Sequence, residues 1–235
     1  MSKKIVITGG SKGIGRACVE KFLSHGYDVA TCSRQASDLD ALKKELESKY
    51  PDRTLWVKPC DVTKADEIQQ WCETLANDWS NLDILINNAG TFIPGGVLSE
   101  AESSLSLQLD TNLMSAYRFT RGLIDMIKQN HSGHIFNMCS IASQKAYPNG
   151  GAYTISKFAL YGFSQCLREE LKPTDIKVTA VLPGATWSES WQGSSFTQND
   201  MIHADDIAAM IWSCSQLSKQ AVVEEFRIRP QGGDL

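Results

Sequence analysis

The chain has 235 residues, enough to bury a sizeable hydrophobic core without disulfides or metals. Its 23 Lys and Arg residues against 27 Asp and Glu residues give a formal charge of −4, and 42% of the residues are hydrophobic. This composition excludes a disordered chain and offers no basic face for nucleic acid or an anionic membrane. No apolar run approaches the roughly 18 residues that span a bilayer, and the first residues do not resemble a signal peptide. We therefore expect one cytoplasmic domain over residues 1–235. The seven cysteines are widely spaced and form no Cys-x-x-Cys pair, so no disulfide framework or metal site is expected.

Short β-branched runs alternate with longer segments of helical period from one end of the chain to the other. The predicted strands are, in chain order, 4–8, 28–33, 54–60, 82–86, 134–139, 177–182 and 225–229. The predicted helices cover 14–25, 38–49, 64–77, 105–129, 152–171 and 204–214. Most of the strands are nearly continuous apolar runs, as in strands covered on both faces. This order predicts an α/β fold: a doubly wound, seven-stranded, mostly parallel sheet flanked by helices on both faces.

Glycines cluster where the first strand turns into the first helix. Residues 8–15 have the sequence Thr-Gly-Gly-Ser-Lys-Gly-Ile-Gly. In a doubly wound sheet the ligand lies at the carboxyl ends of the strands, where glycines let the backbone and a helix N-terminus approach a phosphate. A tight turn also requires glycine, so the segment alone is compatible with a purely structural role.

A phenol and an ammonium share one face of the predicted helix 152–171. Tyr153 and Lys157 are four residues apart, which places them one turn apart. An adjacent cation stabilises a phenolate, so the pair suits proton transfer near neutral pH. Ser140, at the end of the fifth strand, is expected to reach the same space. Tyr and Lys at this spacing are also a common surface pair, which leaves a structural role open.

Five motifs now stand in one order: the glycine segment 8–15, Asn87-Asn88-Ala89-Gly90, Ser140 with Tyr153 thirteen residues later, the segment 153–157, and Pro183-Gly184. In this the chain resembles the short-chain dehydrogenase/reductase family over nearly its whole length. The resemblance implies a Rossmann fold, a homodimer or homotetramer, and a catalytic tetrad of Asn112, Ser140, Tyr153 and Lys157. The thirteen-residue spacing favours Ser140 over the neighbouring Ser143.

The resemblance also implies a role for each member of the tetrad. Tyr153 would exchange a proton with the substrate oxygen, and Ser140 would hydrogen-bond that oxygen. Lys157 would lower the pKa of Tyr153 and hold the ribose of the cofactor. Asn112 would hold a water relay to Lys157 by locally bending its helix, although a plain surface helix Asn is a defensible alternative.

The second predicted strand ends in Ser33 and Arg34 rather than in the acid that usually holds the ribose of NAD. A hydroxyl and a guanidinium suit a 2′-phosphate, and Lys12 is a second cation within reach. NADP(H) is therefore the expected cofactor, unless Arg34 and Lys12 are simply solvated charges. By resemblance, Asp61 and Val62 contact the adenine. The full set of expected cofactor residues is Gly9, Ser11, Lys12, Gly13, Ile14, Gly15, Ser33, Arg34, Asp61, Val62, Asn88, Ala89, Gly90, Tyr153, Lys157, Pro183, Gly184 and Thr186.

The segment 187–201 follows the sixth strand, where the family builds a substrate lid. Its Trp187 and Trp191 are candidate lid anchors, although they are equally compatible with packing on the domain. The other expected substrate residues are Phe92, Ile141, Ala142 and Tyr147. Two functions stay open: a reductase that uses NADPH on a small-molecule carbonyl or alcohol, and a catalytically silent NADP(H)-binding sensor or scaffold.

Overall fold

Seven strands form one parallel sheet in the computed structural model, which describes residues 2–130, 132–187 and 197–233. The strand order is β3-β2-β1-β4-β5-β6-β7, and every paired neighbour runs parallel. The strands are β1 Lys4–Thr8, β2 Asp28–Cys32, β3 Leu55–Val57, β4 Ile84–Asn87, β5 Gly133–Met138, β6 Ile176–Pro183 and β7 Glu225–Ile228. The predicted doubly wound α/β fold is confirmed.

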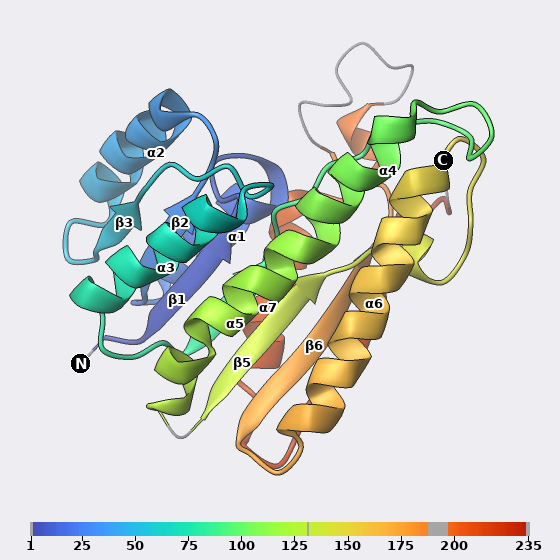
Figure 1. Ribbon diagram of the computed structural model, residues 1–235. Coiled ribbons are helices and arrows are strands. Elements are labelled where there is room, and N and C mark those ends of the chain that lie inside the picture. Colours follow the sequence, from blue (N-terminus) through green and yellow to red (C-terminus); the bar gives the residue numbers. More distant parts are fainter. Residues whose placement is uncertain (1, 131, 188–196, 234–235) are drawn as a thin grey trace.

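Helices cover both faces of this sheet (Figure 1). They are α1 Gly13–Ser24, α2 Ala36–Lys49, α3 Ala65–Asp78, α4 Glu102–Leu109, α5 Ser115–Lys128, α6 Gly151–Leu171 and α7 Ala204–Ser215. One layer contains α1, α2 and α7, which share a buried core with β1 and β2. The other contains α3, α5 and α6, packed over β4, β5 and β6. Because both faces are covered, all four residues of β4 are buried.

The order of the strands reverses between β1 and β4, since the chain first builds outward to β3 and then returns to β4. At such a switch point the loops that follow two neighbouring strands diverge to opposite faces of the sheet and leave a crevice. The glycine segment follows β1 and the Asn-Asn-Ala-Gly segment follows β4. Both therefore lie at this crevice.

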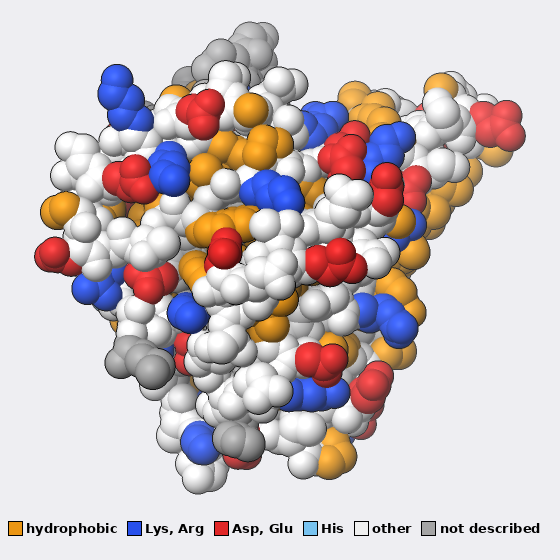
Figure 2. Space-filling view, turned by 60° about the vertical axis from the view of Figure 1, so that its left-hand side comes forward, with side chains coloured by type: hydrophobic (Ala, Val, Ile, Leu, Met, Phe, Trp, Pro, Cys, Tyr) orange, Lys and Arg blue, Asp and Glu red, His pale blue; other side chains and the backbone are white. Residues whose placement is uncertain are grey.

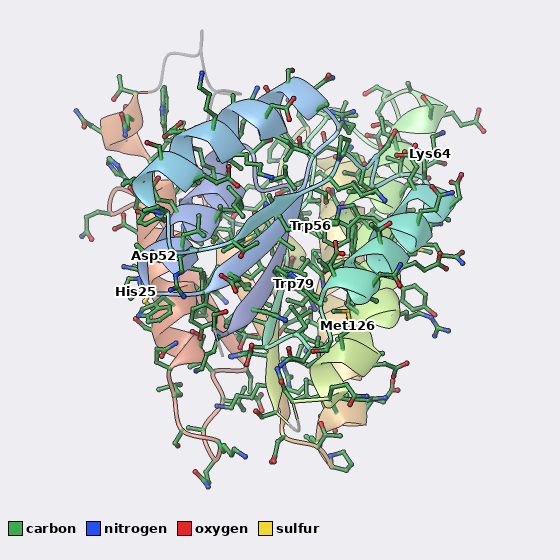
Figure 3. The ribbon with its side chains drawn as sticks, turned by 90° about the vertical axis from the view of Figure 1, so that its left-hand side faces the viewer. His25, Asp52, Trp56, Lys64, Trp79 and Met126 are labelled. Carbon is green, nitrogen blue, oxygen red and sulfur yellow. The ribbon has the colours of Figure 1, made fainter. Side chains whose placement is uncertain are left out.

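The long predicted helix 105–129 differs from what forms. The structure has α4, then a π-helix over Asp110–Met114, then α5. The third strand is also shorter than the predicted 54–60, although the amides of Lys58 and Cys60 still donate to the carbonyls of Thr31 and Ser33 beyond its end. Figure 3 shows this edge of the sheet, with Trp56 on β3.

Acidic and basic side chains are interspersed on the face shown in Figure 2. In the described part of the chain, no helix is both long enough and apolar enough to cross a membrane.

Candidate active site

The glycine segment forms a tight turn that packs against Thr31 of β2. Gly9 and Gly13 have positive φ angles of 69° and 55°, which favour glycine. The amide of Gly10 donates to the Thr31 hydroxyl at 3.1 Å, and a Cβ at Gly10 would lie 2.1 Å from that oxygen. Helix α1 begins at Gly13, and the side chain of its N-cap residue Lys12 makes no capping hydrogen bond. The turn is thus structurally required, and its helix N-terminus still suits a phosphate.

Asn88 joins the two loops of the crevice. Its Nδ2 donates to the carbonyls of Thr8 at 2.9 Å and Gly9 at 3.1 Å. The Thr8 hydroxyl in turn accepts the amides of Asn88 and Ala89, both at 3.0 Å. A Cβ at Gly15 would lie 2.5 Å from Asn88 Nδ2, so glycine is required where α1 passes this contact. Asn88 therefore holds the shape of the crevice.

The segment after β2 carries the residues expected at the adenosine end. Arg34 is exposed, and the Ser33 hydroxyl donates to the Gln35 carbonyl at 3.1 Å. The Lys12 ammonium lies 3.3 Å from the carboxylate of Asp38, so an anion bound there would compete with that pair.

Asp61 and Val62 follow β3 at the same end. Burial raises the pKa of Asp61, but hydrogen bonds from Thr63 and the charges of Arg34 and Lys64 outweigh it, so the pKa is lowered overall. Asp61 is therefore charged near neutral pH, and Val62 is buried beside it. A carboxylate beside Arg34 suits an exocyclic amine better than a phosphate.

Asn112 lies within the π-helix and is almost completely buried. Its Oδ1 accepts the Thr91 amide at 2.7 Å, while its Nδ2 donates to the Thr91 carbonyl at 3.0 Å and to Ser156 Oγ at 2.8 Å. A Cβ at Gly90 would lie 3.1 Å from Asn112 Oδ1 and 3.5 Å from Lys157 Nζ. A surface helix position is thus ruled out, and the expected local distortion of the helix is present.

Tyr153, Lys157 and Ser140 meet at the carboxyl end of β5. Lys157 is buried, its Nζ donates to the Met138 carbonyl at 2.8 Å, and this nitrogen lies 5.7 Å from the centre of the Tyr153 ring. Ser140 caps the short 3-10 helix Ile141–Ser143 and accepts the Ala142 amide at 3.1 Å. This arrangement brings a phenol, a hydroxyl and an ammonium together, with Ser140 and Lys157 buried and Tyr153 half-buried.

The pKa values of these groups are set by burial. Burial raises the pKa of Tyr153, and a hydrogen bond with the Ser140 side chain lowers it only in part. Burial also lowers the pKa of Lys157 to about 8. Desolvation thus disfavours both charged forms, and the expected effect of Lys157 on the pKa of Tyr153 stays a prediction.

The segment after β6 lies next to β7. The amide of Gly184 donates to the Ile228 carbonyl at 2.8 Å, and the Thr186 hydroxyl donates to the Gly184 carbonyl at 3.0 Å. Pro183 is the last residue of β6, and Trp187 is half-buried. Trp191 and the rest of 188–196 lie outside the described residues, so most of the proposed lid does too.

The expected substrate residues fall into two groups. Phe92 is 55% exposed and meets the Tyr153 ring edge to face, with centroids 5.0 Å apart. Ile141 and Tyr147 form the second group: they follow Ser140 in the chain and are half-buried. Ala142, by contrast, is buried and has its amide bound to Ser140, so its position suits support of Ser140 better than substrate contact.

Sequence reasoning missed Ser104, Gln108 and Glu100, which hold the loop beside Tyr153. Ser104 and Gln108 are buried polar residues on α4, spaced four apart in register with Asn112. The spacing of four between Ser104, Gln108 and Asn112 was the available signal, because it places these three residues on one face of a helix.

The comparisons with known proteins agree with this geometry. The family model described as short chain dehydrogenase matches residues 3–199. The chain is 29% identical to a sepiapterin reductase of Chlorobaculum tepidum, across 100% of this chain and 99% of that protein. Among solved structures it is similar to a metagenomic short-chain oxidoreductase in complex with NADP, at 27% identity and a TM-score of 0.84, covering 97% of each chain. An alcohol dehydrogenase of Thermococcus sibiricus complexed with 5-hydroxy-NADP shares the fold, with 23% identity, a TM-score of 0.89, and coverage of 98% of this chain and 97% of that one.

Proposed function

Because the chain belongs to the short-chain dehydrogenase family of oxidoreductases, we propose that it transfers hydride between NADP(H) and a small carbonyl or alcohol substrate. The observation that carries this proposal is that Tyr153, Ser140 and Lys157 lie together at the carboxyl end of β5. Tyr153 and Lys157 come from α6, and Ser140 caps the 3-10 helix that follows β5. A sensor or scaffold that only binds the nucleotide has no need of this buried ammonium, since burying a charge costs stability.

The crevice fits a dinucleotide. The α1 N-terminus and the positive-φ glycines suit a pyrophosphate, and Gly90 leaves room at Lys157 and Asn112. When bound, the nicotinamide supplies or accepts the hydride. Tyr153 donates its proton to the carbonyl oxygen of the substrate, and Ser140 hydrogen-bonds the same oxygen. Lys157 holds the ribose and stabilises the Tyr153 phenolate, and Asn112 fixes the loop above them.

Replacing Tyr153 tests the reaction against silent binding. In Tyr153→Phe, kcat for a panel of ketones, aldehydes and diketones is expected to fall by about 10²–10⁴, because proton transfer is lost. The Kd for NADPH, followed by its fluorescence, is expected to stay within twofold. Tyr117→Phe, at an exposed Tyr on α5, is the matched control. Unchanged turnover in Tyr153→Phe refutes the proposed role, and a wild-type chain that binds NADPH without reducing any carbonyl favours the sensor.

The proposed preference for NADP(H) rests on Arg34 and Ser33 at the end of β2. In Arg34→Ala, affinity for NADPH is expected to fall about tenfold while affinity for NADH barely changes, since a guanidinium–phosphate pair is a strong charge-assisted bond. Fluorescence titration with each nucleotide measures this. Lys44→Ala, at an exposed Lys on α2, controls for the change in net charge. An equal loss for both nucleotides argues against 2′-phosphate recognition.

We also propose that residues 1–235 act as one domain within a cytoplasmic homodimer or homotetramer. Exposed apolar side chains on α4, α5 and α6 support an association, among them Leu107, Tyr117, Ile155 and Phe158. A light-scattering mass of one chain contradicts the oligomer.

A further inference from the structure

The loop after β4 carries Phe92, whose ring is more than half exposed and yet meets Tyr153 edge to face. An exposed phenyl ring on a loop has little packing of its own to hold it. Its two chain neighbours explain its position, because side-chain amides bind both of them through the backbone.

Asn112 and Gln108 bind the loop in the same way. Asn112 accepts the Thr91 amide at 2.7 Å and donates to the Thr91 carbonyl at 3.0 Å. Gln108 accepts the Ile93 amide through Oε1 at 3.1 Å and donates to the Ile93 carbonyl through Nε2 at 3.2 Å. Each amide therefore offers one donor and one acceptor to a single residue, as a neighbouring β-strand does.

This pairing decides where Phe92 points. Hydrogen bonds at Thr91 and Ile93 fix the backbone on both sides of Phe92, which limits the directions that its side chain can take. In the position that results, its ring meets the ring of Tyr153 at 5.0 Å between centroids. The clamp thus places an apolar wall beside the phenol.

Gln108 has no exposed surface, and a buried amide without partners is costly. Its Nε2 also donates to Ser104 Oγ at 3.3 Å, and Ser104 Oγ donates to the Glu100 carboxylate at 3.4 Å. Glu100 accepts the Ala152 amide at 3.3 Å, in the first turn of the helix that carries Tyr153. The row of polar side chains therefore ties the loop to the catalytic helix.

We propose that Gln108 is a positioning residue that holds Phe92 against Tyr153 through Ile93, and that this wall favours substrates with a flat apolar group beside the carbonyl. This inference rests on the proposed function. Gln108 gives a cleaner test than Asn112, since Asn112 also binds Ser156 and lies near Lys157.

The test compares a phenyl ketone with a small aliphatic diketone. In Gln108→Met, which keeps the size but removes the amide, KM for the phenyl ketone is expected to rise about tenfold with kcat within twofold. KM for the diketone is expected to change less than twofold. Phe92→Ala is expected to show the same split, and the double variant is expected to be no worse than Phe92→Ala alone. Ser103→Ala, at an exposed serine on the same helix α4, is the matched control and is expected to keep wild-type KM values.

Additive effects in the double variant, or an equal loss for both substrates, overturn the proposal. Phe92→Ala alters an exposed side chain and does not depend on the stability of Gln108→Met. If it leaves KM for the phenyl ketone unchanged, the proposed wall is refuted by that result alone.

Hydrogen exchange provides a readout that needs no turnover. In Gln108→Met, a peptide that covers Ile93 is expected to exchange at least tenfold faster, while a peptide within β5 stays at the wild-type rate. Unchanged exchange at Ile93 refutes the clamp. Faster exchange in a chain whose wild type reduces no carbonyl supports the clamp and refutes the proposed function instead.

Discussion

Lys157 shows how one residue of the site opposes the stability of the fold. Its ammonium is buried, has the Met138 carbonyl as a hydrogen-bond acceptor, and has its pKa lowered to about 8 by desolvation. The ordinary value is 10.5, so the folded state disfavours the charged form. Below pH 8 the charge therefore costs stability, and this cost disappears as the pH rises from 8 to 10.5.

Replacing this charge should stabilise the chain and abolish its activity. Each pKa unit corresponds to about 1.4 kcal/mol, and the orphaned Met138 carbonyl offsets about 1 kcal/mol of the gain. For Lys157→Met we expect the free energy of unfolding to rise by about 2–3 kcal/mol at pH 7, measured by urea unfolding without nucleotide. At pH 10.5 we expect the gain to be lost. Lys172→Met, at an exposed Lys paired with Glu169, should show neither effect. A destabilised Lys157→Met at pH 7 contradicts this account.

At the scale of elements, the start of α6 sets the position of Tyr153. The N-cap residue Gly150 has no side chain to satisfy the first amides of the helix. A carboxylate from a distant segment fills that role, because Glu100 accepts the Ala152 amide at 3.3 Å. The Gly151 amide donates to the Gly95 carbonyl at 2.9 Å, so the loop before α4 caps the helix with both backbone and side chain.

Glu100 is therefore expected to contribute as a helix cap does. Glu100→Ala should lower the free energy of unfolding by about 1 kcal/mol, because it removes both the hydrogen bond and the negative charge at the helix N-terminus. Glu100→Gln keeps an acceptor and should lose about half as much. Denaturant titration measures both, and Glu73→Ala, at an exposed residue in the middle of α3, is the control. Equal stability of Glu100→Ala and wild type argues against the cap.

The elements that sequence predicted well are those specified by local patterns. β1 and the glycine turn follow from an apolar run and from positive φ angles, which are properties of a few neighbouring residues. The helix distortion at Asn112 was expected only from the family resemblance, and the clamp at Gln108 was missed, because both depend on contacts to residues 15 or more positions away. Likewise, the distance between Tyr153 and Lys157 was predictable from helix geometry, but the pKa of Tyr153 was not, since burial is a tertiary property.

At the scale of the whole molecule, the parallel sheet separates the site from its support. All strands have their carboxyl ends on the same side of the sheet, so Asn88, Ser140 and Gly184 come to that side from distant parts of the chain.

A buried histidine lies toward the opposite side, at the amino ends of the strands. His134 begins the buried part of β5, and its Nε2 lies 2.7 Å from Thr179 Oγ1 on β6. That hydroxyl donates to the Val223 carbonyl at 2.6 Å, so it accepts from a neutral His134 and links three consecutive segments of the sheet.

This histidine should make the fold sensitive to acid. Burial, and to a lesser extent the charge of Lys177, lowers the pKa of His134 from 6.5 to about 3. Between pH 6.5 and 3 the unfolded chain therefore binds a proton that the folded chain does not. The free energy of unfolding decreases as the pH is lowered through this window. The loss amounts to up to about 5 kcal/mol over the whole window, since each pKa unit corresponds to about 1.4 kcal/mol. His134→Gln keeps a donor toward Thr179 but does not titrate. Its unfolding free energy, measured by urea at pH 7 and pH 4.5, should fall less between these values than that of wild type. His25→Gln, at an exposed histidine (Figure 3), should follow the wild-type slope, and a wild-type slope in His134→Gln as well contradicts the assignment.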